Sequence, residues 1–472
     1  MKSSKKIVRE CWISLSFVLM SVSASSSYAQ TSSTSDWDQW NNISEPVFPD
    51  VMWENYATPE DAGWSSRRLA EARETSWSAG SAAVVVIYDG AILTQWGEVE
   101  RRFYCHSIRK SLLSALYGPA VATGDIDLNQ TIGSIGIEEN AGLTSLEQSA
   151  TVSNLMAARS GIYLPAILNT GAVNAIQPSR GSHEPGNYWY YNNWDFNALG
   201  TIYMRKTGDD LFEAFRSQFA IPLQMQDFEL RHTHYRRQPE ISQHPAYIFR
   251  MSARDMARFG LLFLNEGWWK DAQIIPTDWV RESTKMRSVS ATGGYGYMWW
   301  TEIGQLDELG TYTAYGYGGH AIFVVPGARL IMVHRADTYS GKHVSYDAMR
   351  TVLRQILNAR TGPPRPSPIL ETTQAANSVQ SDALLTQAQM APLIGQYIRD
   401  DLIVTVRQID DQLEVESPRH GRFYLRPQSQ TDFRMEDSEW RLSFIVDDAA
   451  VPIRMRIWLA SDDDPYDFVR LP

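Results

Sequence analysis

Two strand-like segments, far apart in the sequence, constrain the fold of this chain more than any other feature. Residues 82–96 form two apolar runs around the turn pair Asp89-Gly90, and residues 321–334 form two more around a Pro-Gly turn. Helical patterns, such as those at 107–121 and 251–264, occupy the sequence between them. This arrangement predicts an α+β fold in which both strand pairs share one sheet.

The sequence changes character after residue 361. Residues 362–387 begin with a proline-rich stretch and continue as polar sequence, which is typical of a linker. Residues 388–472 contain short alternating apolar and polar runs separated by turn residues. Evenly spaced short strands predict a small C-terminal antiparallel β domain. The main domain is therefore expected at residues 50–361.

The N-terminus has the pattern of a secretory signal. Basic residues precede an apolar run, and small residues then lead to a cleavage site after Ala29. We expect residues 1–29 to be a signal peptide and residues 30–49 a leader, with an uncleaved anchor as the alternative for the first segment. No later run is long enough to span a bilayer, so the cleaved protein is expected to be periplasmic or secreted, with no stable membrane span.

Charge and cysteine content limit the partners. The formal net charge is −11 at pH 7, and the expected signal peptide is basic, so the mature chain is still more acidic. An acidic chain is a poor ligand for polyanions, which argues against nucleic acid as a partner. Only Cys105 remains after signal cleavage, so no disulfide can form within the mature chain. No metal-ligand or cofactor motif is present, and the sequence carries no signal for an oligomeric state.

The spacing of one serine and one lysine in the mature chain indicates a candidate catalytic pair. Ser107 and Lys110 are three residues apart at the start of a helical pattern, so their side chains share one face. The helix dipole disfavours a charged lysine at this end, and a neutral lysine can accept the serine proton. The alternative is a capping serine beside a surface lysine.

A second element strengthens this interpretation. Pro185-Gly186 is followed, after four residues, by Tyr191-x-Asn193 and then by an apolar segment ending in Leu-Gly. In this the sequence resembles the serine β-lactamase and penicillin-binding-protein superfamily, especially its class C-like serine hydrolase branch. Tyr190 and Asn192 form a competing pair that lies one residue out of the family's frame.

The resemblance extends over about residues 50–360 and implies a fold and a site. The fold would be an antiparallel sheet flanked by helices, with a helical lobe. Ser107 would be the nucleophile, Lys110 and Tyr191 would carry the proton, and Asn193 would position the substrate or the lysine. The resemblance further implies an oxyanion hole formed by the Ser107 amide and an amide near Gly319.

The family's third element is a Lys-Thr-Gly sequence or an aromatic variant of it on a late strand. The literal copy at residues 206–208 follows a helical pattern too closely, and Gly208 there is typical of a helix C-cap. The positional match is Tyr317-Gly318-Gly319, just before the strand at 321–325. A tyrosine lacks the charge that would hold a substrate carboxylate.

The sequence therefore predicts an exported serine hydrolase that cleaves a small ester or amide without a metal or organic cofactor. The tyrosine at position 317 places β-lactamase or D-alanyl carboxypeptidase activity second. A catalytically silent binding or sensor protein on the same fold is the alternative from a different class.

Overall fold

A computed structural model describes residues 47–472 except for 291–292, 374–384, 449–450 and 461–463. The expected signal peptide and nearly all of the expected leader lie outside the described residues. None of the described helices is long and apolar enough to cross a membrane.

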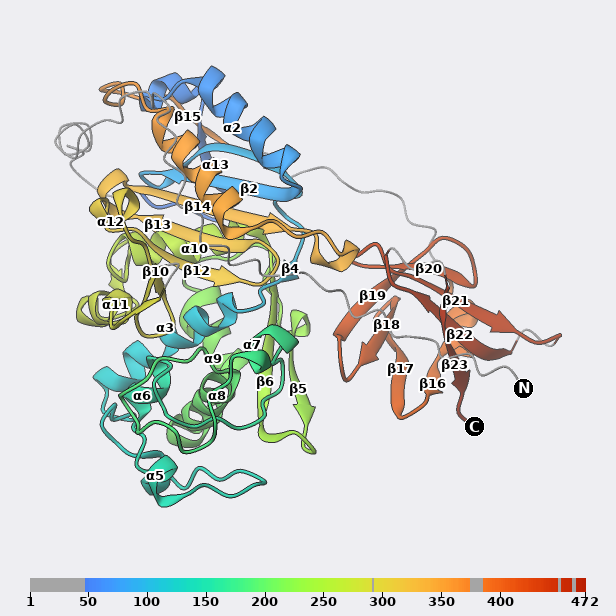
Figure 1. Ribbon diagram of the computed structural model, residues 1–472. Helices are drawn as coiled ribbons and strands as arrows, with labels where there is room; N and C mark the ends of the chain where they lie inside the picture. Colours follow the sequence, from blue (N-terminus) through green and yellow to red (C-terminus); the bar gives the residue numbers. More distant parts are fainter. Residues whose placement is uncertain (1–46, 291–292, 374–384, 449–450, 461–463) are drawn as a thin grey trace, which may run out of the picture.

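A ten-stranded sheet forms the centre of the larger domain and confirms the predicted α+β class (Figure 1). The two predicted strand pairs meet in it, because Val84 of the first lies opposite His334 of the second in an antiparallel register. All neighbouring pairs with a described register are antiparallel except β1 and β3. In spatial order the strands are β15 (Leu370–Thr372), β1 (Glu54–Tyr56), β3 (Ala91–Gly97), β2 (Ser81–Tyr88), β14 (Leu330–Ala336), β13 (His320–Val325), β12 (Tyr312–Gly316), β11 (Trp300–Thr301), β10 (Gly293–Tyr295) and β9 (Ser288–Ser290).

Both faces of this sheet are covered, because its central strand β2 is apolar on both faces. Successive side chains of a strand point to opposite faces. Val84 and Val86 accordingly pack in one apolar cluster with α2 (Ser66–Ser78) and α13 (Tyr346–Asn358). Val85 and Ile87 pack in a second cluster with α3 (Ile108–Ala122) and α10 (Ala253–Leu264), on the side of the helical lobe (Figure 1).

The helical lobe carries the central part of the chain. Its α8 (Asn193–Thr207) is capped by Asn192 at the N-terminus and is followed by Gly208, which has the left-handed backbone typical of a C-cap. The Lys-Thr-Gly copy at 206–208 is thus a helix end. The helices beyond α2 and α13 are α3 (Ile108–Ala122), α4 (Ile132–Ile135), α5 (Ser145–Gln148), α6 (Val152–Met156), α7 (Gly171–Ala175), α8 (Asn193–Thr207), α9 (Leu211–Phe215), α10 (Ala253–Leu264), α11 (Thr277–Thr284) and α12 (Gln305–Glu308).

Two small sheets complete the larger domain. A three-stranded sheet contains β4 (Phe103–Tyr104), β6 (Ser242–Met251) and β5 (Thr233–Gln238), and β7 (Trp268–Trp269) pairs with β8 (Ala272–Gln273). Strand β4 matters for function because it ends three residues before Ser107.

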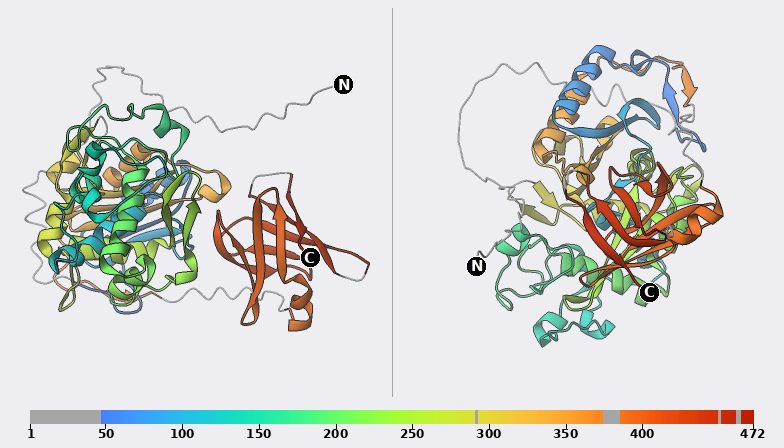
Figure 2. Two further views of the ribbon diagram at one scale, coloured as in Figure 1. Left: turned by 90° about the horizontal axis from the view of Figure 1, so that it is seen from below. Right: turned by 90° about the vertical axis from the view of Figure 1, so that its right-hand side faces the viewer.

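The C-terminal region forms the predicted small β domain, here a closed barrel (Figure 2). Strand β16 closes it by pairing with β23, so Tyr397 lies opposite Arg470. Part of the expected linker belongs to the larger domain, because β15 within it pairs with β1 of the large sheet. After α14 (Gln387–Met390), the strands are β16 (Gly395–Arg399), β17 (Leu402–Ile409), β18 (Gln412–Ser417), β19 (Gly421–Pro427), β20 (Asp432–Met435), β21 (Arg441–Val446), β22 (Pro452–Trp458) and β23 (Tyr466–Arg470).

Candidate active site

Ser107 occupies the N-cap of α3, where the chain turns sharply out of the segment that follows β4. The residue before it, His106, has a left-handed backbone with φ of 47°, which is unusual for a residue with a side chain. The Ser107 hydroxyl makes no capping hydrogen bond to the helix. The hydroxyl is therefore available to the groups that surround it, and Ser107 itself is only half-buried.

Lys110 lies one helical turn further on, and its Nζ is 2.7 Å from Ser107 Oγ. The amine is enclosed by the rings of Tyr191 and Phe196, whose centroids are 4.7 and 4.9 Å away. No carboxylate pairs with it among the described residues. Burial, together with the nearby Arg109 guanidinium, holds the pKa of Lys110 well below its ordinary value. A lysine in this environment loses its proton more readily than an exposed lysine, as a general base requires.

Tyr191 is the second group near the nucleophile, since its hydroxyl is close enough to that of Ser107 for the serine to lower its pKa. Its ring stacks on Trp300 with the centroids 5.5 Å apart. Burial raises the pKa of Tyr191, and the nearby Ser107 hydroxyl partly opposes that rise. At neutral pH the phenol therefore carries its proton and can donate it.

The hydroxyl of Tyr190, the competing tyrosine, points to a different partner. Tyr190 is buried, and its hydroxyl donates a hydrogen bond to the Val173 carbonyl at 3.0 Å. Asn192 is likewise structural, because its carbonyl oxygen accepts from the Trp194 amide at the start of α8. The structure thus brings Tyr191, and not Tyr190, to Ser107.

Asn193 lies at the first turn of α8 without a described hydrogen bond to Ser107 or Lys110. Its Nδ2 donates to the Leu168 carbonyl at 2.9 Å, whereas its buried Oδ1 has no partner among the described residues. An amide oxygen without a partner can accept a hydrogen bond. The structure does not connect Asn193 to the serine or the lysine, and its role in substrate binding stays a prediction.

Tyr317, Gly318 and Gly319 form the turn between β12 and β13. Both glycines have positive φ, and a Cβ on Gly318 would lie 2.4 Å from a Thr338 side-chain carbon. Tyr317 itself is 52% exposed. Its ring contacts the His106 ring in a T-shaped arrangement, with the ring centroids 5.7 Å apart. The turn therefore borders the nucleophile, but Tyr317 lies at the rim of the site.

Two histidines lie beside the turn that presents Ser107: His320, whose position after the glycine motif suggested that it could line the cleft, and His106, which sequence reasoning missed. His106 Nε2 is 3.0 Å from Thr338 Oγ1, and His320 Nε2 is 3.3 Å from the same hydroxyl. Burial lowers the pKa of His106 to about 3, so its ring is neutral at pH 7. The only sequence signal was that His106 adjoins Ser107 and that His320 begins the strand after the turn.

Arg109 and Tyr315 were also missed. Arg109 is buried, donates to Asn197 Oδ1 at 2.8 Å and lies 4.3 Å from the centroid of the Tyr247 ring. Tyr315, on β12, is close enough to Tyr191 to raise the pKa of that phenol slightly. The only sequence signal for Arg109 was that it directly precedes Lys110 in the chain. Nothing in the sequence pointed to Tyr315.

The fold and this arrangement define a class: an α+β protein with a serine–lysine–tyrosine site between a sheet and a helical lobe. The Beta-lactamase family model matches residues 67–363, which is more than half of the chain. The chain belongs to this family, whose members are serine hydrolases on the β-lactamase fold. The resemblance to the superfamily is therefore confirmed.

Several solved structures match parts of the chain. A putative 6-aminohexanoate-dimer hydrolase from Bacillus anthracis is 18% identical, covering 66% of this chain and 89% of its own, with a TM-score of 0.49. The hydrolase EstCE1 is 15% identical, covering 64% and 99%, with a TM-score of 0.46. An octameric penicillin-binding protein homologue from Pyrococcus abyssi is 15% identical, covering 86% and 99%, with a TM-score of 0.45. No curated protein matches the chain.

Proposed function

We propose that this protein is an exported serine hydrolase that cleaves a small ester or amide through an acyl-enzyme on Ser107. One observation carries the proposal: a buried lysine without a described carboxylate partner lies 2.7 Å from the serine hydroxyl. An unactivated serine is a weak nucleophile, and an adjacent neutral amine supplies the missing base. Export rests on the sequence pattern of residues 1–29.

The reaction follows from the positions of three groups. Ser107 Oγ attacks the substrate carbonyl carbon while its proton passes to Lys110 Nζ. Tyr191, whose hydroxyl lies near that of Ser107, delivers a proton to the leaving alcohol or amine as its bond to carbon breaks. Water then attacks the acyl-enzyme, loses a proton to the same pair and restores the serine.

The backbone supports the negative charge that develops on the substrate oxygen. The Ser107 amide has no partner among the hydrogen bonds of the described residues. It lies at the N-terminus of α3, where the helix dipole favours negative charge. This amide therefore provides one donor of an oxyanion hole, and an amide near Gly319 is proposed as the other.

Neutral esters are proposed as the better substrates. Tyr317 offers a neutral hydroxyl and an aromatic face at the rim of the site, where a lysine would offer a charge. Arg180 does not supply this charge, because it is paired with Glu147 at 2.6 Å. Substrates that carry a carboxylate, including penicillins and D-alanyl peptides, thus lose a charge-assisted contact.

Covalent labelling tests the proposal directly. We expect a fluorophosphonate to add one mass adduct to Ser107 of the secreted or periplasmic protein, and Ser107→Ala to abolish both labelling and p-nitrophenyl ester turnover. Benzylpenicillin and a D-Ala-D-Ala peptide are tested as substrates in the same experiment. A wild-type protein that prefers either of these would support the second activity, and one that neither reacts nor turns over any substrate would be a silent binding protein.

A further inference from the structure

The C-terminal barrel contacts the segment that leads into the nucleophile. The Tyr104 hydroxyl donates a hydrogen bond to the His420 carbonyl of the barrel at 2.7 Å. Phe103 is fully buried in an apolar cluster made mainly of barrel side chains, among them Trp440. Both residues belong to β4, and Ser107 follows only three positions later. The barrel is therefore in direct contact with the scaffold of the site.

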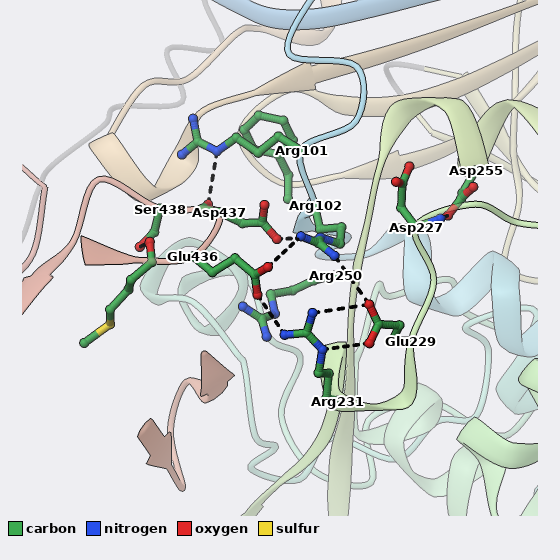
Figure 3. A network of polar contacts seen from close by, with 12 residues as sticks. Arg101, Arg102, Asp227, Glu229, Arg231, Arg250, Asp255, Glu436, Asp437 and Ser438 are labelled. Atoms are coloured by element: carbon green, nitrogen blue, oxygen red, sulfur yellow. Dashed lines mark hydrogen bonds and ion pairs between the residues drawn. The ribbon is translucent and has the colours of Figure 1, made fainter. Parts of the chain in front are cut away.

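Ion pairs continue this contact toward the start of the segment (Figure 3). Glu436 and Asp437 lie in the barrel turn between β20 and β21, and both face Arg102. Arg102 Nε is 2.5 Å from Asp437 Oδ2, and its NH2 is 3.1 Å from Glu436 Oε1. Arg101 donates to the Asp437 carbonyl at 3.0 Å. Four consecutive residues before the nucleophile's turn thus contact the barrel.

These charges are shielded from water, which distinguishes them from ordinary surface pairs. The side chains of Arg102, Glu436 and Asp437 are 14%, 11% and 10% exposed. A second arginine of the larger domain, Arg231, donates to Glu436 Oε2 at 2.8 Å. Exposed pairs contribute little to stability, whereas removing one partner of a buried pair leaves an uncompensated charge. The barrel carboxylates therefore hold Arg102 firmly in place.

The opposite side of the segment is held by the larger domain. The buried Arg335 donates to the carbonyls of Phe103 and Tyr104 at 2.8 and 3.0 Å. The Cys105 amide donates to the Phe249 carbonyl at 2.9 Å. The segment is thus clamped between the large domain and the barrel, immediately before the left-handed turn at His106.

The same cluster is poorly suited to a metal ion. His232, Glu436 and Asp437 place potential ligand atoms within 4.8 Å of one another. Both carboxylates, however, already accept hydrogen bonds from Arg102 or Arg231, and these guanidinium groups would repel a cation. The carboxylates are better explained as anchors for arginine than as metal ligands.

We propose that Glu436 and Asp437 are positioning residues for Ser107: they anchor Arg102, and through β4 they hold the turn that presents the nucleophile to Lys110. This inference rests on the proposed function. The barrel then is a part of the catalytic scaffold, and its carboxylates act through Arg102 without touching the substrate. A mutation far from the reacting groups can lower the rate by about 100-fold when it displaces one of those groups by about 1 Å.

The test uses the full-length protein with Glu436→Gln and Asp437→Asn combined, which keeps side-chain shape and removes both charges. The matched control is Asp467→Asn, which breaks a barrel ion pair with Arg456 whose side chains are about two-fifths exposed. Three measurements are compared: the rate of fluorophosphonate labelling, kcat and KM for a neutral ester, and hydrogen exchange of residues 101–110.

We expect the double variant to lose at least about tenfold in labelling rate and kcat, with KM changed by less than about threefold. Hydrogen exchange in residues 101–110 should accelerate, while the control matches the wild type in all three measurements. If the double variant does not fold, each single variant is measured in the same way, with a smaller loss expected.

Two results would overturn the inference. One is a segment that exchanges faster while labelling and kcat stay within twofold of the wild type. The other is unchanged exchange together with unchanged rates. A wild-type protein that is never labelled at Ser107 would instead refute the proposed function, and the exchange measurement would still show whether the carboxylates hold the segment.

Discussion

The chemistry of the site depends on one buried amine whose environment disfavours its charge. Lys110 is 2% exposed, faces two aromatic rings and has Arg109 as its charged neighbour. An ammonium in such a place loses hydration without gaining a counter-charge. The same environment that makes the lysine a useful base therefore destabilises the fold when the lysine is protonated.

Lys110→Met should separate these two effects. We expect kcat/KM to fall by about 10²–10⁴-fold, the usual contribution of a general base. The pKa of Lys110 is lower in the fold than in the unfolded chain, so the unfolded chain binds more protons between those two pKa values. The free energy of unfolding of the wild type should consequently rise with pH over that range.

Because methionine has no proton to lose, that pH dependence should disappear in Lys110→Met, and stability at neutral pH should be equal to or above that of the wild type. The wild-type kcat/KM should rise with pH and level off below the ordinary pKa of lysine. Urea unfolding and ester turnover measured across pH check both statements. A rate that keeps rising through the ordinary lysine range would contradict the assignment of Lys110 as the base.

Adjacent tyrosines provide a matched pair of substitutions. Tyr191→Phe removes the hydroxyl that lies near Ser107, and we expect acylation to slow by about 10²-fold or more. Tyr190→Phe removes only a hydrogen bond to Val173, which contributes about 1 kcal/mol to stability. Stopped-flow labelling and thermal unfolding of both variants check this. Equal losses of activity would show that the site does not distinguish the two tyrosines.

At the scale of elements, β12 and β4 determine how closely the sheet approaches the nucleophile. Gly316, the last residue of β12, lies against the segment before Ser107, and an added Cβ would be 2.6 Å from the Cys105 carbonyl oxygen. The absence of a side chain at this position thus allows the strand end to lie beside the turn at His106.

Gly316→Ala should push β12 and the nucleophile's turn apart. We expect a loss of about 1–3 kcal/mol in the free energy of unfolding, as for other overpacked sites, and at least a tenfold loss of kcat. The control is Gly171→Ala in α7, where an added Cβ meets no atom within 4 Å. That variant should keep full activity and wild-type stability or better. Full activity of Gly316→Ala would show that the contact does not constrain the site.

At the scale of the whole molecule, one sheet and one interface join distant parts of the chain. Strand β2 near the start of the larger domain pairs with β14 near its end, and β15 beyond it returns to pair with β1. The barrel then packs against β4 through Phe103 and the Arg102 ion pairs. The site is therefore assembled from both ends of the larger domain and braced by the C-terminal barrel.

Local patterns in the sequence determined the helices and strands, and one residue pair of the site. Apolar runs around turn pairs predicted the central strands of the sheet. Alternating runs predicted the strands of the barrel, because a strand alternates its faces with a period of two. The spacing of Ser107 and Lys110 predicted a shared helix face, because that geometry depends only on the helix. The α+β class and the small β domain followed from the order of these patterns.

Only the tertiary structure decided which neighbours meet. Consecutive residues such as Tyr190 and Tyr191 point in different directions, and packing against Trp300 and Val173 selects which one reaches Ser107. The clamp of Arg102 by Asp437 joins residues more than 300 positions apart. Local periodicity carries no information about such contacts, because they depend on how whole elements pack and on which buried charges need a partner.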